Sequence, residues 1–582
     1  MGRNMKKINY ILGILAAAAA MTSCVGDLNV TPIDPNANTV DKVLTSQQAL
    51  DSYISGVYLG FATSGYYGPN GDPSISGLDG GASQYIRGLY HHNELTTDES
   101  VCGWNDQTIK NFHYMNWTTD DTFIYAFYSR IFMQVSAANE FIREVGKLDY
   151  DATIRDRYIA EARTLRAIAY FHALDNFGNV PFADENAVVG VNPEQISRAD
   201  LFAWLETELK DIISSGKLPE KNAVVAGHIS AGAAKFLLAK LYLGAQVYTG
   251  TARWNDCADV LKDLMDDGYS LHTTPNGKTF SAYQDLFLAD NDKCTDEIIF
   301  AVQQDGLYTQ SYGVTNYLVL ASTGGTMNVN HLGISSGWGG LRTTPEFADK
   351  FTASDTRNLL YDTAKSTADV EAMPETPEQR GDSEVKIEKL KKDGKYEDEC
   401  KNLRDAKNAA RKDNIQEKSI EDIGNFKYGY GFQKFRNVTS AGEIPNMVYD
   451  EENDQWNNPG FVNTDFPMMR YADVLLMAAE CEARGASCNG LAAFNQVRAR
   501  AGVPAVSNLS LDEILDERAR ELYQECWRRS DLIRFGKFTS GYNWQWKGET
   551  KDGKDVESYR TLFPIPDSDR LANSNLSQNE GY

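Results

Sequence analysis

Apolar residues recur at spacings of three and four along much of the chain, which is the period of one face of an α-helix. Small apolar residues alternate with large ones, and glycine turns at Gly216 and Thr249-Gly250 separate the stripes. The pattern predicts a mostly α fold of tetratricopeptide-like helix pairs, which bury their apolar faces by stacking. The stripes cover residues 162–173, 201–212 (with Asp200 as the expected cap), 231–245, 258–265, 470–483 and 511–527.

Three segments depart from this pattern. Residues 60–115 and 305–345 are rich in Gly, Tyr and Asn and have neither a helical nor a strand period. Long irregular loops in a compact body commonly carry function, so we expect the ligand site there. Residues 365–425 are dense in Glu, Lys and Asp. They predict a solvated helical excursion, with a partner-binding site as the alternative.

The N-terminus has the pattern of an export signal. Basic residues precede an apolar run over residues 8–21, which is shorter than the roughly 20 residues that span a bilayer. The sequence MTSC at 21–24 is similar to a bacterial lipobox, with Met where Leu is usual. We therefore expect a lipoprotein signal peptide over 1–23, lipidation of Cys24, a leash over 25–38 and a single domain over 24–582. An ordinary cleavage site is the alternative.

Composition and charge narrow the classes of ligand. Of 582 residues, 42% are hydrophobic and 24% charged, as in a globular protein. The net charge of −24 argues against nucleic acid and against charge-driven docking on anionic lipid. The 30 Tyr, 25 Phe and 9 Trp suit a neutral, hydroxyl-rich ligand, although a helical core also accounts for many aromatic residues.

Signals for metal and catalytic sites are weak. The eight cysteines contain no CxxC pair and the seven histidines no HExxH, and the odd number of cysteines after Cys24 excludes a disulfide framework. The acidic pair Asp98 and Glu99 suggests a glycoside hydrolase as an alternative. A glycosidase, however, needs carboxylates on both sides of the bond it cleaves, and two adjacent residues do not by themselves provide that. We expect no enzyme and no cofactor. The turn Asp290-Asn291-Asp292 is either a capping turn or a calcium site.

Several segments resemble the RagB/SusD family of bacterial outer-membrane lipoproteins. Together they extend from Cys24 to Tyr582, and the resemblance implies a helical, non-enzymatic, surface-exposed glycan-binding protein. The segments are Cys24 with Asp27-Leu28 and Pro32, EARTLRA at 161–167 followed by Tyr170-Phe171, NFGNVP at 176–181, RYADVLLM at 470–477 with Glu480, ERAREL at 517–522, RRSDLIRFG at 528–536 and FPIP at 563–566.

Other segments are similar to a starch-binding member of that family, namely 93–99, 312–313, 336–338 and 577–582. The resemblance implies that three aromatic plates form an arc beneath a bent α-1,4-glucan and that polar side chains bind its hydroxyl rim. For Asp79 and Arg87 the alternative is an internal salt bridge. The family also has an amide shortly after the first tryptophan, and the resemblance does not choose between Asn105 and Gln107 for that position. The implied ligand-binding residues are Trp104, Tyr312, Trp338, Asp79, Arg87 and either Asn105 or Gln107.

The resemblance also implies where the protein acts and with what. We expect a lipoprotein on the outer face of the outer membrane that binds starch, amylose and maltooligosaccharides. A SusC-like TonB-dependent transporter would import the captured glycan. The alternatives are a different glycan or a peptide as ligand of the same fold and, last, a glycoside hydrolase.

Overall fold

The computed structural model describes residues 40–71, 73–188 and 190–582. The expected signal peptide, Cys24 and the leash over 25–38 therefore lie outside the described residues. The chain divides after Asp51, and residues Ser52–Tyr582 form one compact unit, which carries every feature discussed below. Among the described residues, no helix combines the length and apolar composition that a membrane crossing needs.

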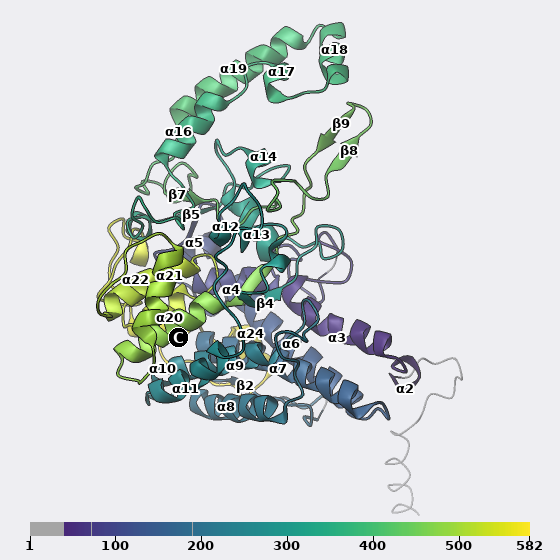
Figure 1. Ribbon diagram of the computed structural model, residues 1–582, viewed down its shortest axis with the longest axis vertical. Helices are drawn as coiled ribbons and strands as arrows, with labels where there is room; N and C mark the ends of the chain where they lie inside the picture. Colours follow the sequence, from purple (N-terminus) through teal and green to yellow (C-terminus); the bar gives the residue numbers. More distant parts are fainter. Residues whose placement is uncertain (1–39, 72, 189) are drawn as a thin grey trace, which may run out of the picture. The chain divides into compact units, whose positions relative to one another are not determined.

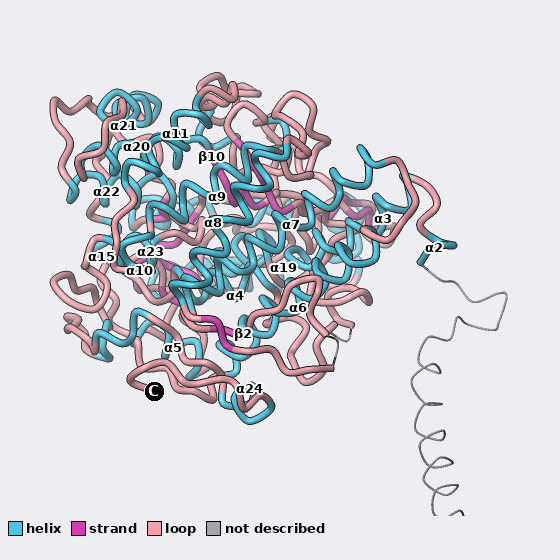
Figure 2. Tube along the Cα trace, turned by 90° about the horizontal axis from the view of Figure 1, so that it is seen from below, coloured by secondary structure: helices cyan, strands magenta, loops and turns pink. Residues whose placement is uncertain are grey.

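The unit is mostly helical, as the stripes predict (Figure 1). Neighbouring helices pack pairwise: α6 on α7, α7 on α8, α8 on α9, α9 on α11, and α20 on α11, α21 and α22. Figure 2 shows α7, α8 and α9 side by side. The helices are α2 (Val40–Val43), α3 (Gln47–Ala62), α4 (Tyr85–Asn93), α5 (Gln107–Tyr114), α6 (Thr122–Val145), α7 (Ala152–Asn176), α8 (Arg198–Ser215), α9 (Ala231–Leu243), α10 (Ala245–Thr249), α11 (Trp254–Met265), α12 (Ala282–Asp285), α13 (Val314–Ser322), α14 (Val329–Leu332), α15 (Pro345–Ala348), α16 (Thr363–Ala372), α17 (Pro377–Arg380), α18 (Glu384–Lys392), α19 (Tyr396–Asp413), α20 (Tyr471–Ala483), α21 (Gly490–Arg500), α22 (Leu511–Leu522), α23 (Arg528–Arg534) and α24 (Asp567–Ala572), with short 3-10 helices η1 (Asn291–Lys293), η2 (Lys547–Glu549) and η3 (Ser558–Thr561).

Two predicted helix ends are wrong. Ser197, not Asp200, caps α8, because the Ser197 side chain accepts a hydrogen bond from the backbone N–H of Asp200. The stripe over 511–527 stops being helical at Leu522, since Gln524 and Cys526 have φ of 62° and 68°. The turn after α22 therefore takes the left-handed conformation that no helix accommodates.

The two segments without a period are less irregular than predicted. Segment 60–115 contains α4 and α5, and segment 305–345 contains α13 and α14. Every residue of α4 and of α13 is buried. The apolar sequence of α13 has no polar face, so it lacks the amphipathic period from which helices are predicted. In α4 the fold buries Arg87, His91 and His92, which are residue types that a sequence pattern assigns to the surface.

Short strands connect the helical elements. Four of them form an antiparallel sheet in the order β1-β5-β7-β6, and the others form pairs. β1 leads into the predicted site segment and pairs with β5 through Val101–Arg342 and Cys102–Leu341. The strands are β1 (Val101–Cys102), β2 (Val180–Pro181), β3 (Gln195–Ile196), β4 (Ile298–Val302), β5 (Leu341–Thr343), β6 (Leu360–Tyr361), β7 (Tyr430–Phe432), β8 (Val448–Asp450), β9 (Gln455–Asn457) and β10 (Phe466–Arg470).

The charged segment is helical and largely exposed, as predicted. Helices α16, α17 and α18 each pack against α19, and the four together form an arm (Figure 1). Most arm residues are exposed, and their ion pairs, such as Arg411 with Glu371, lie at the surface. Such pairs contribute little to stability, so the arm is held by a few buried side chains such as Cys400 and Ala410.

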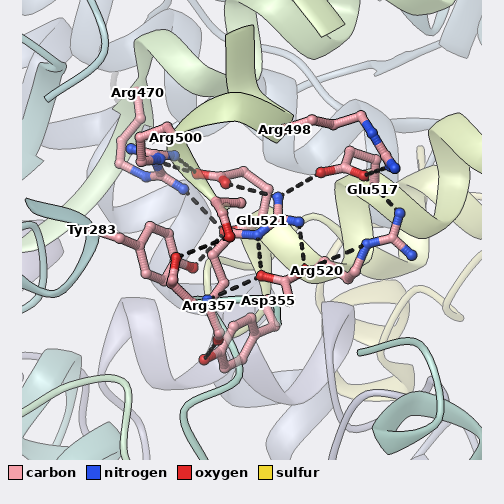
Figure 3. Close-up of polar contacts among 12 residues, drawn as sticks. Tyr283, Asp355, Arg357, Arg470, Arg498, Arg500, Glu517, Arg520 and Glu521 are labelled. Atoms are coloured by element: carbon pink, nitrogen blue, oxygen red, sulfur yellow. Dashed lines mark hydrogen bonds and ion pairs between the residues drawn. The ribbon is translucent and has the colours of Figure 1, made fainter. Parts of the chain in front are cut away.

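A buried network of ion pairs joins the C-terminal helices (Figure 3). The carboxylate of Glu521 on α22 accepts from Arg470 at 3.0 Å and from Arg357 at 3.2 Å, and it also pairs with Arg500. Buried charges are tolerated only when they are paired and hydrogen-bonded, so the network ties β10, α21 and α22 into one arrangement. Glu297, Asp355, Glu517 and Glu525 supply its other carboxylates.

Candidate functional site

The three predicted aromatic plates meet in the fold. The ring centroids of Trp104 and Trp338 lie 6.4 Å apart, and those of Tyr312 and Trp338 lie 5.8 Å apart. The ring planes are tilted by 50° and 64° respectively. All three side chains are half-buried, so each keeps exposed surface for a ligand. We call Trp104, Tyr312 and Trp338 the aromatic arc; Trp338 is its centre.

Backbone hydrogen bonds hold the Trp338 loop against the C-terminal end of α13. The N–H of Trp338 donates to Leu320 O at 2.7 Å, and the Trp104 indole N–H donates to Trp338 O at 3.1 Å. The loop approaches its neighbours so closely that it requires glycine. A Cβ on Gly337 would lie 2.2 Å from Thr323 O, and one on Gly340 would lie 2.7 Å from the Trp104 ring. The arc is therefore preformed by local backbone geometry.

Arg87 lies beneath the arc. Its guanidinium carbon is 4.6 Å from the Tyr317 ring centroid and 5.5 Å from that of Trp104, and its Nη1 donates to the carbonyls of Gly81 and Tyr312. Burial lowers the pKa of Arg87, whereas the neighbouring Tyr317, Cys102 and Asp79 act in the opposite direction. Arg87 thus positions the loops that carry Asp79 and Tyr312, and its direct contact with a sugar stays a prediction.

Asp79 lies at the surface near this arginine. Its Oδ1 accepts from the N–H of Ala82 at 2.7 Å. Among the ion pairs of the described residues, none joins Asp79 to Arg87, so the salt-bridge alternative has no support there. A contact of Asp79 with sugar hydroxyls stays a prediction.

The two candidate amides are both exposed. Asn105 follows Trp104 directly, and its Oδ1 accepts from Lys110 at 3.2 Å. Gln107 is the first residue of α5, and its Nε2 donates to Asn111 at 2.8 Å on the same helix. Each amide keeps one free polar atom, so the choice between them stays open.

The structure adds three residues that sequence reasoning missed. Gln84 caps α4 and accepts from the backbone N–H of both Arg87 and Val314, which joins the loop before α4 to the start of α13. Phe461 packs beside Tyr312 at 5.7 Å, and Asn70 accepts the Tyr312 hydroxyl at 2.8 Å. A polar residue directly before a helix is a recognisable cap signal, so Gln84 could have been predicted. No local sequence pattern identifies Phe461 or Asn70.

Asp98 and Glu99, the two carboxylates that suggested a glycoside hydrolase, are buried in the interior. Asp98 pairs with Arg528 and accepts the Tyr542 hydroxyl; burial raises its pKa, but Arg528 outweighs burial and lowers it. Glu99 accepts the backbone N–H of Gln524 and is 1% exposed. Neither carboxylate reaches a glycan, so the structure gives them a supporting role.

Glu99 leads to a prediction on stability. Burial raises its pKa to about 8, while an unfolded glutamate titrates near 4.3. Its contribution to stability is therefore complete below about pH 4.3 and is lost as the pH rises through about 8. Glu99→Gln cannot ionise, so we expect its free energy of unfolding to fall by about 3 to 4 kcal/mol less than that of the wild type between pH 5 and pH 8. Urea denaturation at the two pH values measures this.

Glycan binding by Glu99→Gln should equal that of the wild type, because the glutamine retains the acceptor for Gln524. If the free energies of unfolding of the wild type and of Glu99→Gln changed equally with pH, the pKa of Glu99 would not be raised. A loss of binding would mean that Glu99 supports the segment leading through β1 to Trp104.

A serine motif near the arc has the wrong surroundings for a nucleophile. Residues 333–337 read GISSG, the spacing of a nucleophile elbow. An elbow places its serine between a strand and a helix. Here Ser335 follows α14 and precedes a loop to β5, and its N–H donates to Pro459 O. The motif therefore provides no catalytic geometry.

The Asp-rich turn is neither a helix cap nor a cluster of metal ligands. Asp290 makes no side-chain cap; its oxygens accept from Ser440 N and Oγ and from Lys293. Across the described residues, no group of three or more His, Cys, Asp or Glu side chains is placed to hold a metal. The seven described cysteines, which begin at Cys102, are free. This agrees with the prediction that disulfides do not organise the fold.

Comparisons with known proteins show which family the chain belongs to. The fold and the arc define a helical binding protein with a preformed aromatic platform. The profile of the SusD family matches residues 296–582. The starch-binding protein SusD of Bacteroides thetaiotaomicron is 30% identical over 600 aligned residues, which cover 99% of this chain and 100% of that protein. SusD-like protein P25 of Formosa agariphila is 25% identical, covering 85% and 83%. The chain belongs to the SusD family.

Solved structures agree with this fold. Surface glycan-binding protein A from Bacteroides thetaiotaomicron, in complex with laminarihexaose, matches with a TM-score of 0.64 at 19% identity, over 91% of this chain and 99% of that one. A SusD superfamily protein from Parabacteroides distasonis matches with a TM-score of 0.64 at 20% identity, over 93% and 100%. Glycan-binding proteins of the SusD family are non-catalytic, which confirms the prediction that this chain is not an enzyme.

Proposed function

We propose that this protein binds starch-like α-1,4-glucans, including amylose and maltooligosaccharides, on its aromatic arc. The observation that carries the proposal is the meeting of Trp104 from segment 60–115 with Tyr312 and Trp338 from segment 305–345, all three half-exposed. The name of its relative, the starch-binding protein SusD, supports the same ligand.

The geometry of the arc favours a curved ligand. Each sugar ring presents a face of C–H bonds that an indole or phenol ring can cover. The tilts of 50° and 64° between neighbouring plates suit successive rings that turn relative to one another, as in an α-1,4-glucan. A straight β-1,4 ribbon would contact only one plate. Asp79 and one amide, Asn105 or Gln107, supply hydrogen bonds to the hydroxyl rim.

A calorimetric panel on the protein without residues 1–24 tests the ligand. We expect maltoheptaose and a cyclic α-glucan of similar curvature to bind about equally, cellohexaose to bind poorly, and no reducing ends to be released. Tighter binding of laminarihexaose than of maltoheptaose would overturn the starch assignment in favour of another glycan. No binding to any glycan would overturn glycan capture altogether.

The location and partner are also proposals. Lipidation of Cys24 would tether the protein to the outer membrane, facing the cell surface, where a SusC-like TonB-dependent transporter would receive the glycan. The support is the N-terminal pattern of basic residues, a short apolar run and MTSC at 21–24. Acyl chains such as palmitate would then be the membrane-binding element.

Replacing the lipidated residue tests the anchor. We expect Cys24→Ala to yield protein without acyl chains that leaves the outer-membrane fraction, because the thiol that accepts the lipid is missing. Labelling cells with a palmitate analogue, followed by fractionation, measures this, with Cys102→Ala as a control for another cysteine. A Cys24→Ala protein still acylated at the outer membrane would refute the assignment.

A further inference from the structure

A two-stranded hairpin, β8–β9, exposes a second group of aromatic side chains. Trp456 is 63% exposed and Tyr449 is 44% exposed. The two residues are cross-strand partners, and their ring centroids lie 5.1 Å apart. They stand on one face of the hairpin, while Val448, 60% exposed and opposite Asn457, stands on the other. We call Tyr449 and Trp456 the hairpin pair.

Contacts at its turn hold the hairpin in place. Asp450 Oδ1 accepts from the N–H groups of Glu452 and Asn453, at 3.1 and 3.2 Å. The arm contacts the same turn, because Ser383 donates to Asn453 O and Lys389 pairs with Glu452. An isolated hairpin is marginal in water, so these contacts account for its defined position. The hairpin pair is therefore preorganised, which lowers the entropy cost of binding.

The hairpin is continuous with the aromatic arc. Trp456 is five positions before Phe461, which packs on Tyr312, so the Cα atoms of Trp456 and Phe461 lie within roughly 18 Å of each other. Between them, Asn458 donates to Ile334 O at 3.0 Å and Pro459 O accepts from Ser335 N at 3.0 Å. The strand leaving the hairpin thus runs along the loop that carries Trp338.

The negative charge around the hairpin pair favours an uncharged ligand. The turn is acidic at positions 450, 451, 452 and 454, and Lys389 beside it is already paired. This potential disfavours nucleic acid, anionic lipid and acidic peptides. Gln455 and Asn457 stand on the other face of the hairpin with Val448, and Gln455 Nε2 donates to Asn457 Oδ1 at 3.0 Å. The exposed face of the hairpin pair is therefore aromatic, and two exposed rings side by side suit the C–H faces of a sugar chain.

We propose that the hairpin pair is a second contact for the same glycan chain, which extends the binding path beyond the aromatic arc and favours polymers over short oligosaccharides. The inference rests on the proposed function, because the arc must hold the first part of that chain. Long chains would contact both places, whereas a compact cyclic glucan would occupy only the arc.

The test compares two ligands on matched variants. Trp456→Ala should weaken amylose binding roughly tenfold or more, since it removes a stacking plate, and leave the affinity for a cyclic α-glucan unchanged. Trp456→Tyr, which keeps a plate, should retain most of the amylose affinity. Val448→Ala is the control, because it removes an exposed apolar side chain from the other face of the same hairpin. Calorimetry and mobility in amylose-containing gels measure the affinities.

Three results would contradict the proposal for the hairpin pair. If the wild type binds neither ligand, the proposed function falls and the extension with it. If the wild type binds both and Trp456→Ala binds amylose as well as the wild type does, the extension alone is overturned, and a protein partner becomes the better occupant. Equal losses in Trp456→Ala and Val448→Ala would overturn it too, because they would reflect disruption of the hairpin.

Discussion

Trp338→Ala and Trp104→Ala are each expected to abolish nearly all binding of maltooligosaccharides. One plate covers roughly 80 Å² of apolar surface, worth about 2 kcal/mol at about 25 cal/mol per Å². A loss of that size weakens binding roughly 30-fold, and a shallow site has little affinity to spare.

The geometry ranks the three plates. Trp338 touches both other members of the arc, so its removal divides the platform. Trp104 also donates its indole N–H to Trp338 O, so Trp104→Ala removes a plate and loosens the centre. Tyr312 is a smaller plate at the end of the arc. We therefore expect Tyr312→Ala to reduce binding strongly but less than either tryptophan variant.

Calorimetry with maltoheptaose measures these losses, and circular dichroism checks the fold. Trp104→Phe keeps an aromatic plate, although a smaller one without the indole N–H, so it should bind better than Trp104→Ala. Tyr308→Ala is the matched control, because Tyr308 is 86% exposed and lies four residues before Tyr312. Wild-type affinity in both tryptophan variants, with unchanged circular dichroism, would place the site elsewhere.

Glu521→Gln is expected to lower the free energy of unfolding by about 3 kcal/mol or more at pH 7. The substitution preserves volume but removes the negative charge that faces Arg357, Arg470 and Arg500 in the buried network (Figure 3). Three guanidinium groups then remain in the interior with one carboxylate fewer.

The effect should depend on pH. Burial by itself would raise the pKa of Glu521, but Arg500, Arg470 and Arg357 outweigh burial and hold it at about 2. An unfolded glutamate titrates near 4.3, so the contribution of Glu521 is complete above that pH and is lost as the pH falls towards 2. The difference between wild type and Glu521→Gln should therefore shrink below about pH 4.3.

Urea denaturation at pH 7, 5 and 3.5 measures both effects. Glu371→Gln is the matched control, because its pair with Arg411 lies on the surface, where solvent screens the charges and the expected change is small. Equal stability losses in the two variants would show that the buried network does not support the fold.

Much of the helical framework was predictable from the chain. The stripes over 162–173, 231–245 and 258–265 correspond to α7, α9 and α11, because each of these helices lies against its neighbours through an apolar face whose spacing a sequence displays. α13 escaped prediction because it is apolar on every side, and α4 because its buried Arg87, His91 and His92 are residue types that usually lie at the surface. The left-handed turn at Gln524 and Cys526 escaped it too, because neither residue type announces a positive φ.

The sequence by itself predicted the site's chemistry, through the resemblance that singled out Trp104, Tyr312, Trp338, Asp79 and Arg87 and through the net charge, which argues against nucleic acid and anionic lipid. Only the tertiary structure decided which of these groups touch. It placed Arg87 beneath the plates, buried Asp98 and Glu99, and brought Phe461 to the end of the arc. The reason is that contacts such as Trp104 with Trp338 and Tyr312 with Phe461 join segments far apart in the chain, and long-range packing, which no local period encodes, brings them together.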